Sequence, residues 1–261
     1  MFDAPNADGT VRKAIQVLDQ VSSFGCPVWF SELLTNSSFT KPNLYRFLQT
    51  LTNQGTLAFD PERQKYWMGI RLVRLVHSAW RQSSLVPITR PHIESLAEKV
   101  GKAVHLAQFD NDKVLFVDKY KVKDMFDTLA QAGKIAPGYC TGVGKAILAF
   151  MTEAQQNRSL DQQSYKAYTP ATLSDRTALV AELAWIRKNG VAYDREEHEQ
   201  GIISIASPIL TSKGRVVGAV SIATSTNRYK ISDLKKQKPY LLKCANLIGT
   251  EAESWQVPTW S

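Results

Sequence analysis

The order of periodic patterns in the first 70 residues constrains the fold more than any other feature of this chain. Apolar residues recur at three- and four-residue steps over 11–21, which predicts an amphipathic helix that ends before Gly25. A short helix is expected over 30–34, with Ser31 as its N-cap, and the polar segment 35–38 ends it.

The following helix is the most informative segment. Thr40 is suited to cap it, and Pro42 is suited to its first turn, where a missing N–H has no cost. Four residues at i, i+3, i+4 and i+7 form a stripe that we expect to be buried: Leu44, Phe47, Leu48 and Leu51. No Asp or Glu occurs between Glu32 and Asp60. The absence of carboxylates is what a surface that approaches phosphate requires.

Two short strands are predicted next, over 56–59 and 65–68, on either side of the turn-rich loop 60–64. Three helices followed by a hairpin is the order of a winged helix-turn-helix, in which the second helix of the motif enters the DNA major groove. The same pattern is compatible with a small three-helix module that binds protein, and this alternative stays open.

Eight side chains are our predicted DNA contacts. They belong to the exposed positions of the third helix and to the wing: Lys41, Pro42, Asn43, Tyr45, Arg46, Gln49, Arg63 and Lys65. The net charge of +8 and the pI of about 9.3 favour an anionic partner. Residues 1–75 hold only eight basic and six acidic residues, so the argument depends on where these charges lie.

The rest of the chain predicts a helical linker and a larger α+β domain. The helix over 70–82 has an apolar stripe wide enough to serve a partner subunit as well, and a dimer would place two recognition helices about 34 Å apart. Beyond it, patterns predict helices at 88–100, 145–151, 176–188 and 232–248, and strands at 103–109, 114–120, 202–210 and 215–224, with a turn at 110–112. This is a mainly antiparallel sheet of the kind that holds a small ligand on one face.

We therefore predict three parts: a DNA-binding domain over 1–70, a linker over 71–86 and a ligand-binding domain over 87–254. No secretory signal and no membrane-spanning apolar run is recognised, so a cytoplasmic location is expected. The three cysteines are far apart and odd in number, which supports neither a disulfide framework nor a zinc site.

Several segments resemble functional motifs, but a structural interpretation fits each of them better. The segment 138–145 fails as a phosphate loop, because Tyr139 and Ala146 replace the glycine and the Ser/Thr that such a loop requires. The acidic cluster 194–199 is compatible with a metal or general-base site, but we favour a solvated loop with capping carboxylates. His105 is expected to be a satisfied core or pocket-edge histidine. The lysines at 230–243 are expected to form a solvated helix face.

Three sequence blocks carry a family resemblance that covers about 11–227. They are FSELLTNSSFTKPNLYRFLQTLTNQGTL followed by YWMGIRLVRL, then YCTGVGKAILAF, and then IRKNGVAYDREEHEQGIISIASPILTSKGRVVGAVSIAT. With these blocks in this order, the chain resembles the IclR (isocitrate lyase regulator) family of transcription factors. Two positions depart from the family pattern: Ser38 stands where Gly is usual, and Asn43 where Thr is usual.

The resemblance implies a GAF-like domain that binds a small carboxylate or an aromatic acid, and a homodimer or a dimer of dimers on double-stranded DNA. In similar proteins backbone N–H groups at a glycine-rich helix start hold the effector carboxylate, and two facing strands complete the pocket. The matching positions here are Gly142, Val143, Ile202, Ser204, Ser221 and Ala223. Ala223 replaces a residue that is often polar, which favours a larger or aromatic ligand.

A ligand-responsive DNA-binding regulator is thus the predicted function, with no catalytic residue, cofactor or metal. The alternative is an enzyme of small-acid metabolism, or a protein-interaction module, that uses the helix-turn-helix for assembly. Ser204 and Ser221 lie outside G-x-S-x-G and have no evident base partner, so we interpret them as ligand-binding or packing residues.

Overall fold

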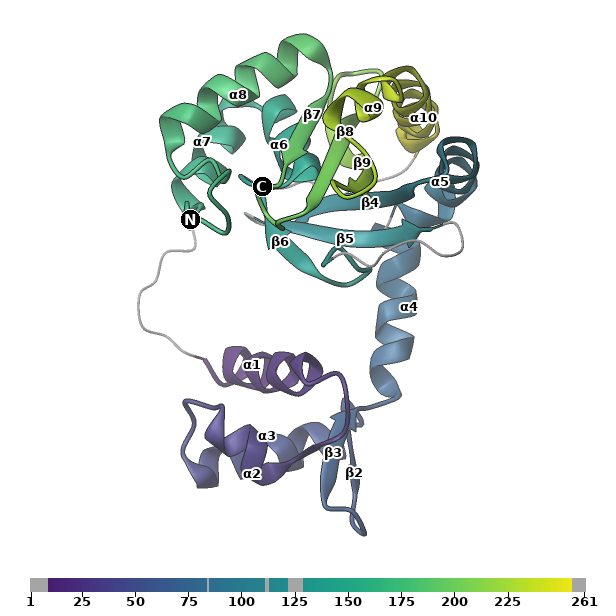
Figure 1. Ribbon diagram of the computed structural model, residues 1–261. Helices are drawn as coiled ribbons and strands as arrows, with labels where there is room; N and C mark the ends of the chain where they lie inside the picture. The colour runs from purple at the N-terminus through teal and green to yellow at the C-terminus, as the bar shows by residue number, and fades with distance from the viewer. Residues whose placement is uncertain (1–8, 84, 111–112, 122–128, 255–261) are drawn as a thin grey trace. The chain divides into compact units, whose positions relative to one another are not determined.

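The computed structural model describes residues 9–83, 85–110, 113–121 and 129–254. Two compact units make up the chain, Met1–Gln82 and Ser83–Ser261 (Figure 1). In the described residues no helix is both long enough and apolar enough to cross a membrane.

Residues 9–70 of the N-terminal unit form three helices and a small antiparallel sheet (Figure 1). The elements are α1 (Thr10–Ser23), β1 (Val28–Trp29), α2 (Phe30–Thr35), α3 (Lys41–Asn53), β2 (Leu57–Asp60) and β3 (Lys65–Met68), and the strand order is β1-β3-β2. The predicted stripe of α3 is buried as expected and packs in one core with Val17, Val28 and Leu33. Strand β1 was not predicted, because a two-residue strand has no periodicity of its own.

The start of α2 corrects one prediction. The N-cap is Trp29, not Ser31, and its N–H donates to the Glu32 carboxylate at 3.0 Å. A glutamate three residues after the cap satisfies a donor at the helix start, so Ser31 lies inside the first turn.

Helix α4 (Arg71–Ser83) follows the hairpin. Val73, Leu75 and Val76 are all exposed on it, although they are apolar. These exposed residues agree with the predicted apolar stripe, which is wider than packing within one domain requires.

The C-terminal unit is built on a six-stranded antiparallel sheet with the order β6-β5-β4-β9-β8-β7 (Figure 1). The strands are β4 (Ala103–Asp110), β5 (Lys113–Tyr120), β6 (Ile135–Pro137), β7 (Ala192–Arg195), β8 (Ile202–Leu210) and β9 (Val216–Ser225). The helices are α5 (Val86–Val100), α6 (Gly142–Phe150), α7 (Glu153–Gln162), α8 (Arg176–Asn189), α9 (Ile231–Lys235) and α10 (Lys238–Glu251), with a short 3₁₀ turn at Ala252–Ser254. The predicted mainly antiparallel α+β domain is confirmed.

Alternation along the central strands gives the sheet two unlike faces. Large apolar residues such as Val220 and Ile222 pack in the core that α5 and α10 share. Small residues such as Ala206 and Ala219 belong to the core on the other side, with α6 and α8. Small side chains let α6 approach the sheet closely, and this is the face on which a pocket forms.

Two further predictions differ from the structure. The single helix expected over 232–248 is two helices, because Pro239 has no N–H to offer the carbonyl of Lys235 and cannot continue the ladder. The short elements β6, β7 and α7 were not predicted. Most of the turn expected at 110–112 lies outside the described residues.

Candidate functional site

The outer face of α3 carries the predicted DNA contacts. Lys41, Pro42, Asn43, Tyr45, Arg46 and Gln49 are all exposed. Their spacing leaves Leu44, Phe47 and Leu48 to anchor the helix to the core, so packing fixes which face remains outward. The exposed face offers amide groups, a phenol and two cations, and these groups suit phosphate oxygens and base edges.

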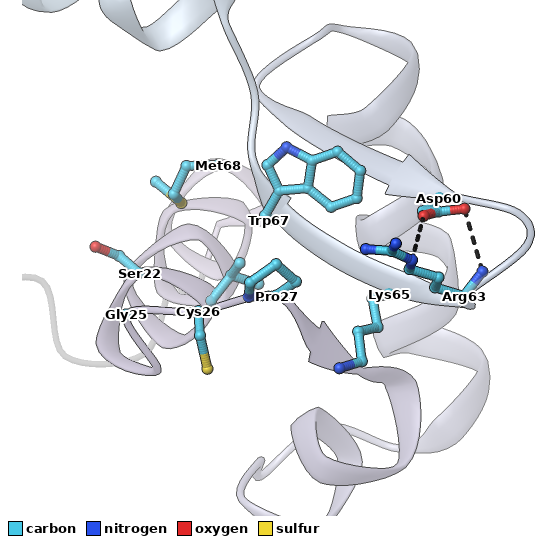
Figure 2. Close-up of a pocket in the computed structure, with 10 residues that line it drawn as sticks. Ser22, Gly25, Cys26, Pro27, Asp60, Arg63, Lys65, Trp67 and Met68 are labelled. Atoms are coloured by element: carbon cyan, nitrogen blue, oxygen red, sulfur yellow. Dashed lines mark hydrogen bonds and ion pairs between the residues drawn. The ribbon is translucent and has the colours of Figure 1, made fainter.

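The hairpin of β2 and β3 presents the other two predicted contacts (Figure 2). Asp60 accepts hydrogen bonds from the N–H groups of Glu62 and Arg63, at 2.8 and 3.1 Å, and so holds the loop in a tight turn. The side chain of Arg63 is 81% exposed, with its Nε 3.8 Å from an Asp60 oxygen. Lys65 is half-buried, with its Nζ 3.8 Å from the centre of the Trp29 ring. Arg63 is therefore the more available of the two cations.

An open groove of about 680 Å³ lies beside the same hairpin. Cys26 and Pro27 line it from the end of α1, and Lys65, Trp67 and Met68 line it from β3 (Figure 2). No unpartnered polar side chain points to a ligand there, among the residues described, and the predicted ligand contacts lie elsewhere.

A second pocket brings together all six of the predicted effector contacts. It is lined by His105, Phe116, Ala130, Thr141, Gly142, Val143, Asp194, His198, Glu199, Ile202, Ser204, Ser221 and Ala223. These residues come from β4, β5, β7, β8, β9, the start of α6 and the loops that hold Ala130, His198 and Glu199, which are far apart in sequence.

Strand register explains how the pocket forms. Ser204 on β8 lies opposite Ala223 on β9 and opposite Asp194 on β7. His105 on β4 lies opposite Ser221 on β9. Directly opposed residues point to the same face of a sheet, so the register places these five side chains on one face.

The start of α6 covers part of this face. A Cβ on Gly142 would lie 2.7 Å from Oγ of Ser204, so a larger residue here would force the Ser204 hydroxyl to move. Thr141 caps the helix: its Oγ accepts from the N–H of Gly144 at 3.3 Å, and its carbonyl accepts from the N–H of Lys145. Within the described part of the chain, the N–H groups of Gly142 and Val143 have no such acceptor. A helix start with unpaired donors binds anions.

A buried ion pair lies behind the pocket. Lys145 is fully buried, and its Nζ lies 2.6 and 2.7 Å from the two carboxylate oxygens of Glu197 and 3.4 Å from Glu182. Burial raises the pKa of the Glu197 carboxyl, and the Lys145 ammonium opposes that rise. The pair ties the loop after β7 to α6, and Lys145 is not among the lining residues.

The acidic cluster therefore differs from the solvated loop that we predicted. Asp194 and Glu197 are 8% and 3% exposed. Oδ1 of Asp194 accepts from the N–H of Glu197 at 2.8 Å, and Oε1 of Glu197 accepts from the N–H of Arg195 at 3.4 Å, so both carboxylates also bond to backbone as capping groups do. Burial, reinforced by the Glu197 charge, raises the pKa of Asp194 to about 7. The prediction fails because burial of Asp194 depends on pairing between β7 and β8, which the sequence does not display.

His105 is the pocket-edge histidine that the sequence predicted. The side chain lines the pocket and packs edge-on against the Phe116 ring, with centroids 5.8 Å apart. It is 1% exposed, and its Nε2 is buried without a hydrogen-bond partner, so it is not a satisfied core histidine. Burial, with a contribution from the Lys119 charge, lowers the pKa of His105 to about 3. The imidazole is thus neutral at physiological pH.

The free space between the lining residues is small, about 40 Å³. Binding sites for drug-sized molecules typically hold about 300–1,000 Å³. A ligand larger than a few atoms therefore has to displace lining side chains when it enters.

The family model for the bacterial transcriptional regulator IclR C-terminal domain matches residues 77–250. The chain belongs to the IclR family of transcriptional regulators. Over 225 residues, which are 86% of this chain and 89% of the relative, it is 29% identical to the HTH-type transcriptional regulator XynR of Escherichia coli. The Thermotoga maritima IclR crystal structure is 27% identical, with a TM-score of 0.72 over 92% of this chain and 97% of that one.

A third relative was solved with a ligand. It is an IclR homologue of Microbacterium hydrocarbonoxydans in complex with 4-hydroxybenzoate, with a TM-score of 0.78 over 93% of this chain and 98% of that one. The two sequences are 21% identical, so this likeness establishes the shared fold only.

Proposed function

We propose that this IclR-family protein binds operator DNA through α3 and the wing, and that a small organic acid in the C-terminal pocket modulates this binding. The observation that carries the proposal is the exposed, carboxylate-free face of α3, whose donors and cations suit DNA. The DNA contacts are the eight predicted ones on α3 and the hairpin. DNA binding also places the protein in the cytoplasm.

The effector contacts are those of the second pocket. The N–H groups of Gly142 and Val143 bind the carboxylate, and the hydroxyls of Ser204 and Ser221 add hydrogen bonds from the sheet. Ile202 and Ala223 supply apolar contact. A relative that binds 4-hydroxybenzoate supports an acid of this class.

The narrowness of the pocket supports a regulatory role for the acid. A ligand that has to displace lining side chains binds one conformation better than another, and this difference in affinity is what shifts a population. The unpartnered Nε2 of His105 gives an opened pocket a further hydrogen-bonding group.

Assembly as a homo-oligomer is part of the proposal. The exposed apolar residues of α4 suit a second copy of this chain, and a dimer presents two recognition helices to the two halves of an operator. We retain the boundaries 1–70, 71–86 and 87–254 for the DNA-binding domain, the linker and the effector domain. The curated relatives are regulators, and they favour this reading over an enzyme of small-acid metabolism.

A mobility shift with DNA from directly upstream of the protein's own gene and its neighbours tests the proposal. The wild-type chain is compared with Arg46→Ala, which removes an exposed cation from α3, and with Arg158→Ala, which removes an exposed cation from α7. We expect sequence-selective binding by the wild type, a loss of at least about 10-fold in Arg46→Ala, and no change in Arg158→Ala.

Lack of binding by the wild type on every fragment, at low salt and with candidate acids present, overturns the regulator proposal. Equal losses in the two variants show that only net charge is read, and they remove α3 from the interface. The DNA that binds then serves to screen acids for an effect on the shift.

A further inference from the structure

The charges that line the effector pocket do not match an anionic ligand. Two described lining residues are acidic, Asp194 and Glu199, and none is Lys or Arg. The two lining histidines do not supply the missing charge, because burial lowers the pKa of both His105 and His198. Lys145 is near, but its ammonium is held by both oxygens of Glu197.

The acid proposed as effector would bind next to one of these carboxyls. The start of α6 packs against β7, since a Cβ on Gly142 would lie 3.5 Å from the backbone N of Asp194. A carboxylate on the N–H groups of Gly142 and Val143 therefore approaches the Asp194 side chain, which lines the same pocket. Two carboxylates at close range in a buried site do not both remain ionised.

The described groups around Asp194 provide no free positive charge that could balance two carboxylates. Facing it are Lys145 from α6, Glu197 and Glu199 from the loop after β7, and the hydroxyl of Ser204 from β8. The one cation in this set is already paired, and the partial positive charge of a helix start is about half a unit. A neutral Asp194, by contrast, carries an O–H that can donate to the incoming carboxylate.

We propose that Asp194 contacts the effector in its neutral, protonated form, so that binding of an acid anion requires this carboxyl to hold a proton. This inference rests on the proposed function, which places an acid in this pocket. Where Asp194 is ionised beforehand, one solvent proton is taken up with the effector anion, and both are released on dissociation. Because the pKa of Asp194 is raised to about 7, about half of the molecules already carry this proton at neutral pH, before the acid binds.

Calorimetric titration of the full-length chain tests this coupling. The probes are acetate, lactate, benzoate and 4-hydroxybenzoate, each at pH 6, 7 and 8, in phosphate and in Tris. These acids remain anions throughout, so any pH dependence reports the protein. For each acid that binds, we expect the affinity to fall about 10-fold from pH 6 to pH 8, with close to one proton taken up at pH 8.

Two variants separate this coupling from a general pH effect. Asp194→Asn keeps a donor and an acceptor but does not titrate, so the fall in affinity should shrink to under about 2-fold. Glu98→Gln, on the exposed face of α5, should retain the full 10-fold dependence.

Three results overturn the inference: affinity that is independent of pH in the wild type, a pH dependence that survives in Asp194→Asn, or no binding of any probe acid at pH 6. The mobility shift distinguishes these failures from a failure of the proposed function. DNA binding that persists without acid binding leaves the DNA-binding half standing and rejects the acid pocket.

Discussion

The two regions proposed to meet anions have opposite electrostatic designs. The face of α3 and the wing carry cations on an exposed surface, and α3 lies in a segment without Asp or Glu, between Glu32 and Asp60. The pocket in the C-terminal unit is buried and lined by two carboxyls without a lysine or arginine, among the residues described. DNA phosphates stay partly solvated and are attracted from a distance, whereas a small acid is desolvated when it binds.

If both proposals hold, solvent exposure, more than the sign of the ligand, determines which groups bind an anion. At the surface, a charged side chain stays hydrated and has little desolvation cost, and salt screens its interactions. In the interior a free cation is costly, and in the proposed site backbone N–H groups and a proton on Asp194 take its place. Lys145, which is fully buried, has its charge matched by Glu197.

Removing Glu197, the charge partner of Lys145, should produce the largest loss of stability. Glu197→Ala leaves the Lys145 ammonium buried with only the Glu182 contact at 3.4 Å, and we expect the C-terminal unit to lose about 3–5 kcal/mol of unfolding free energy. Urea unfolding measures the loss. Arg46→Ala, at an exposed site, should change stability by less than about 0.5 kcal/mol.

The double variant Lys145→Met with Glu197→Leu sharpens this test, because it removes both charges together. It should recover most of the lost stability. A loss below about 1 kcal/mol in Glu197→Ala would mean that Lys145 finds another partner, and the contrast between buried and surface charge would then fail.

The pH dependence of stability should show the next largest effect. The pKa of Asp194 rises from 3.8 to about 7 on folding, so the folded chain holds a proton that the unfolded chain releases above pH 4. The wild type therefore loses stability as pH rises from about 4 to 7. Asp194→Asn lacks this loss, and its stability relative to the wild type should increase by about 2–3 kcal/mol between pH 5 and pH 8. Thermal or urea unfolding at the two pH values checks this; a constant difference contradicts it.

The same contrast explains what the sequence predicts well. Helices α1 and α3 and the hairpin follow from local signals: a 3.6-residue period, Pro42 in the first turn, and a polar loop between two short strands. Phe47 and Leu48 face the core, so the helical period places Arg46 on the opposite, exposed side of α3. A surface site on one helix is thus visible in a single stretch of sequence.

The pocket is not visible in that way. Six of its lining residues were predicted from the family resemblance, not from their own spacing, because they lie on elements that meet only through strand register. Asp194 was misjudged for the same reason, because its burial results from the pairing of β7 with β8. The signal available was the acidic cluster 194–199 itself, which is polar beyond what a turn requires.

The smallest effects should come from the wing, and they test whether this surface reads charge alone. Arg63 is highly exposed and contacts only Asp60 among the described side chains, at 3.8 Å, so Arg63→Ala should leave the fold unchanged. If Arg63 contacts a phosphate, the Arg63→Ala variant should lose affinity a few-fold for specific and unrelated DNA alike. The slope of log affinity against log salt concentration should also become shallower by about 1. Arg63→Lys keeps the charge and should keep the slope. Selective loss on the operator alone would instead show that Arg63 reads bases, as a side chain inserted into the minor groove does.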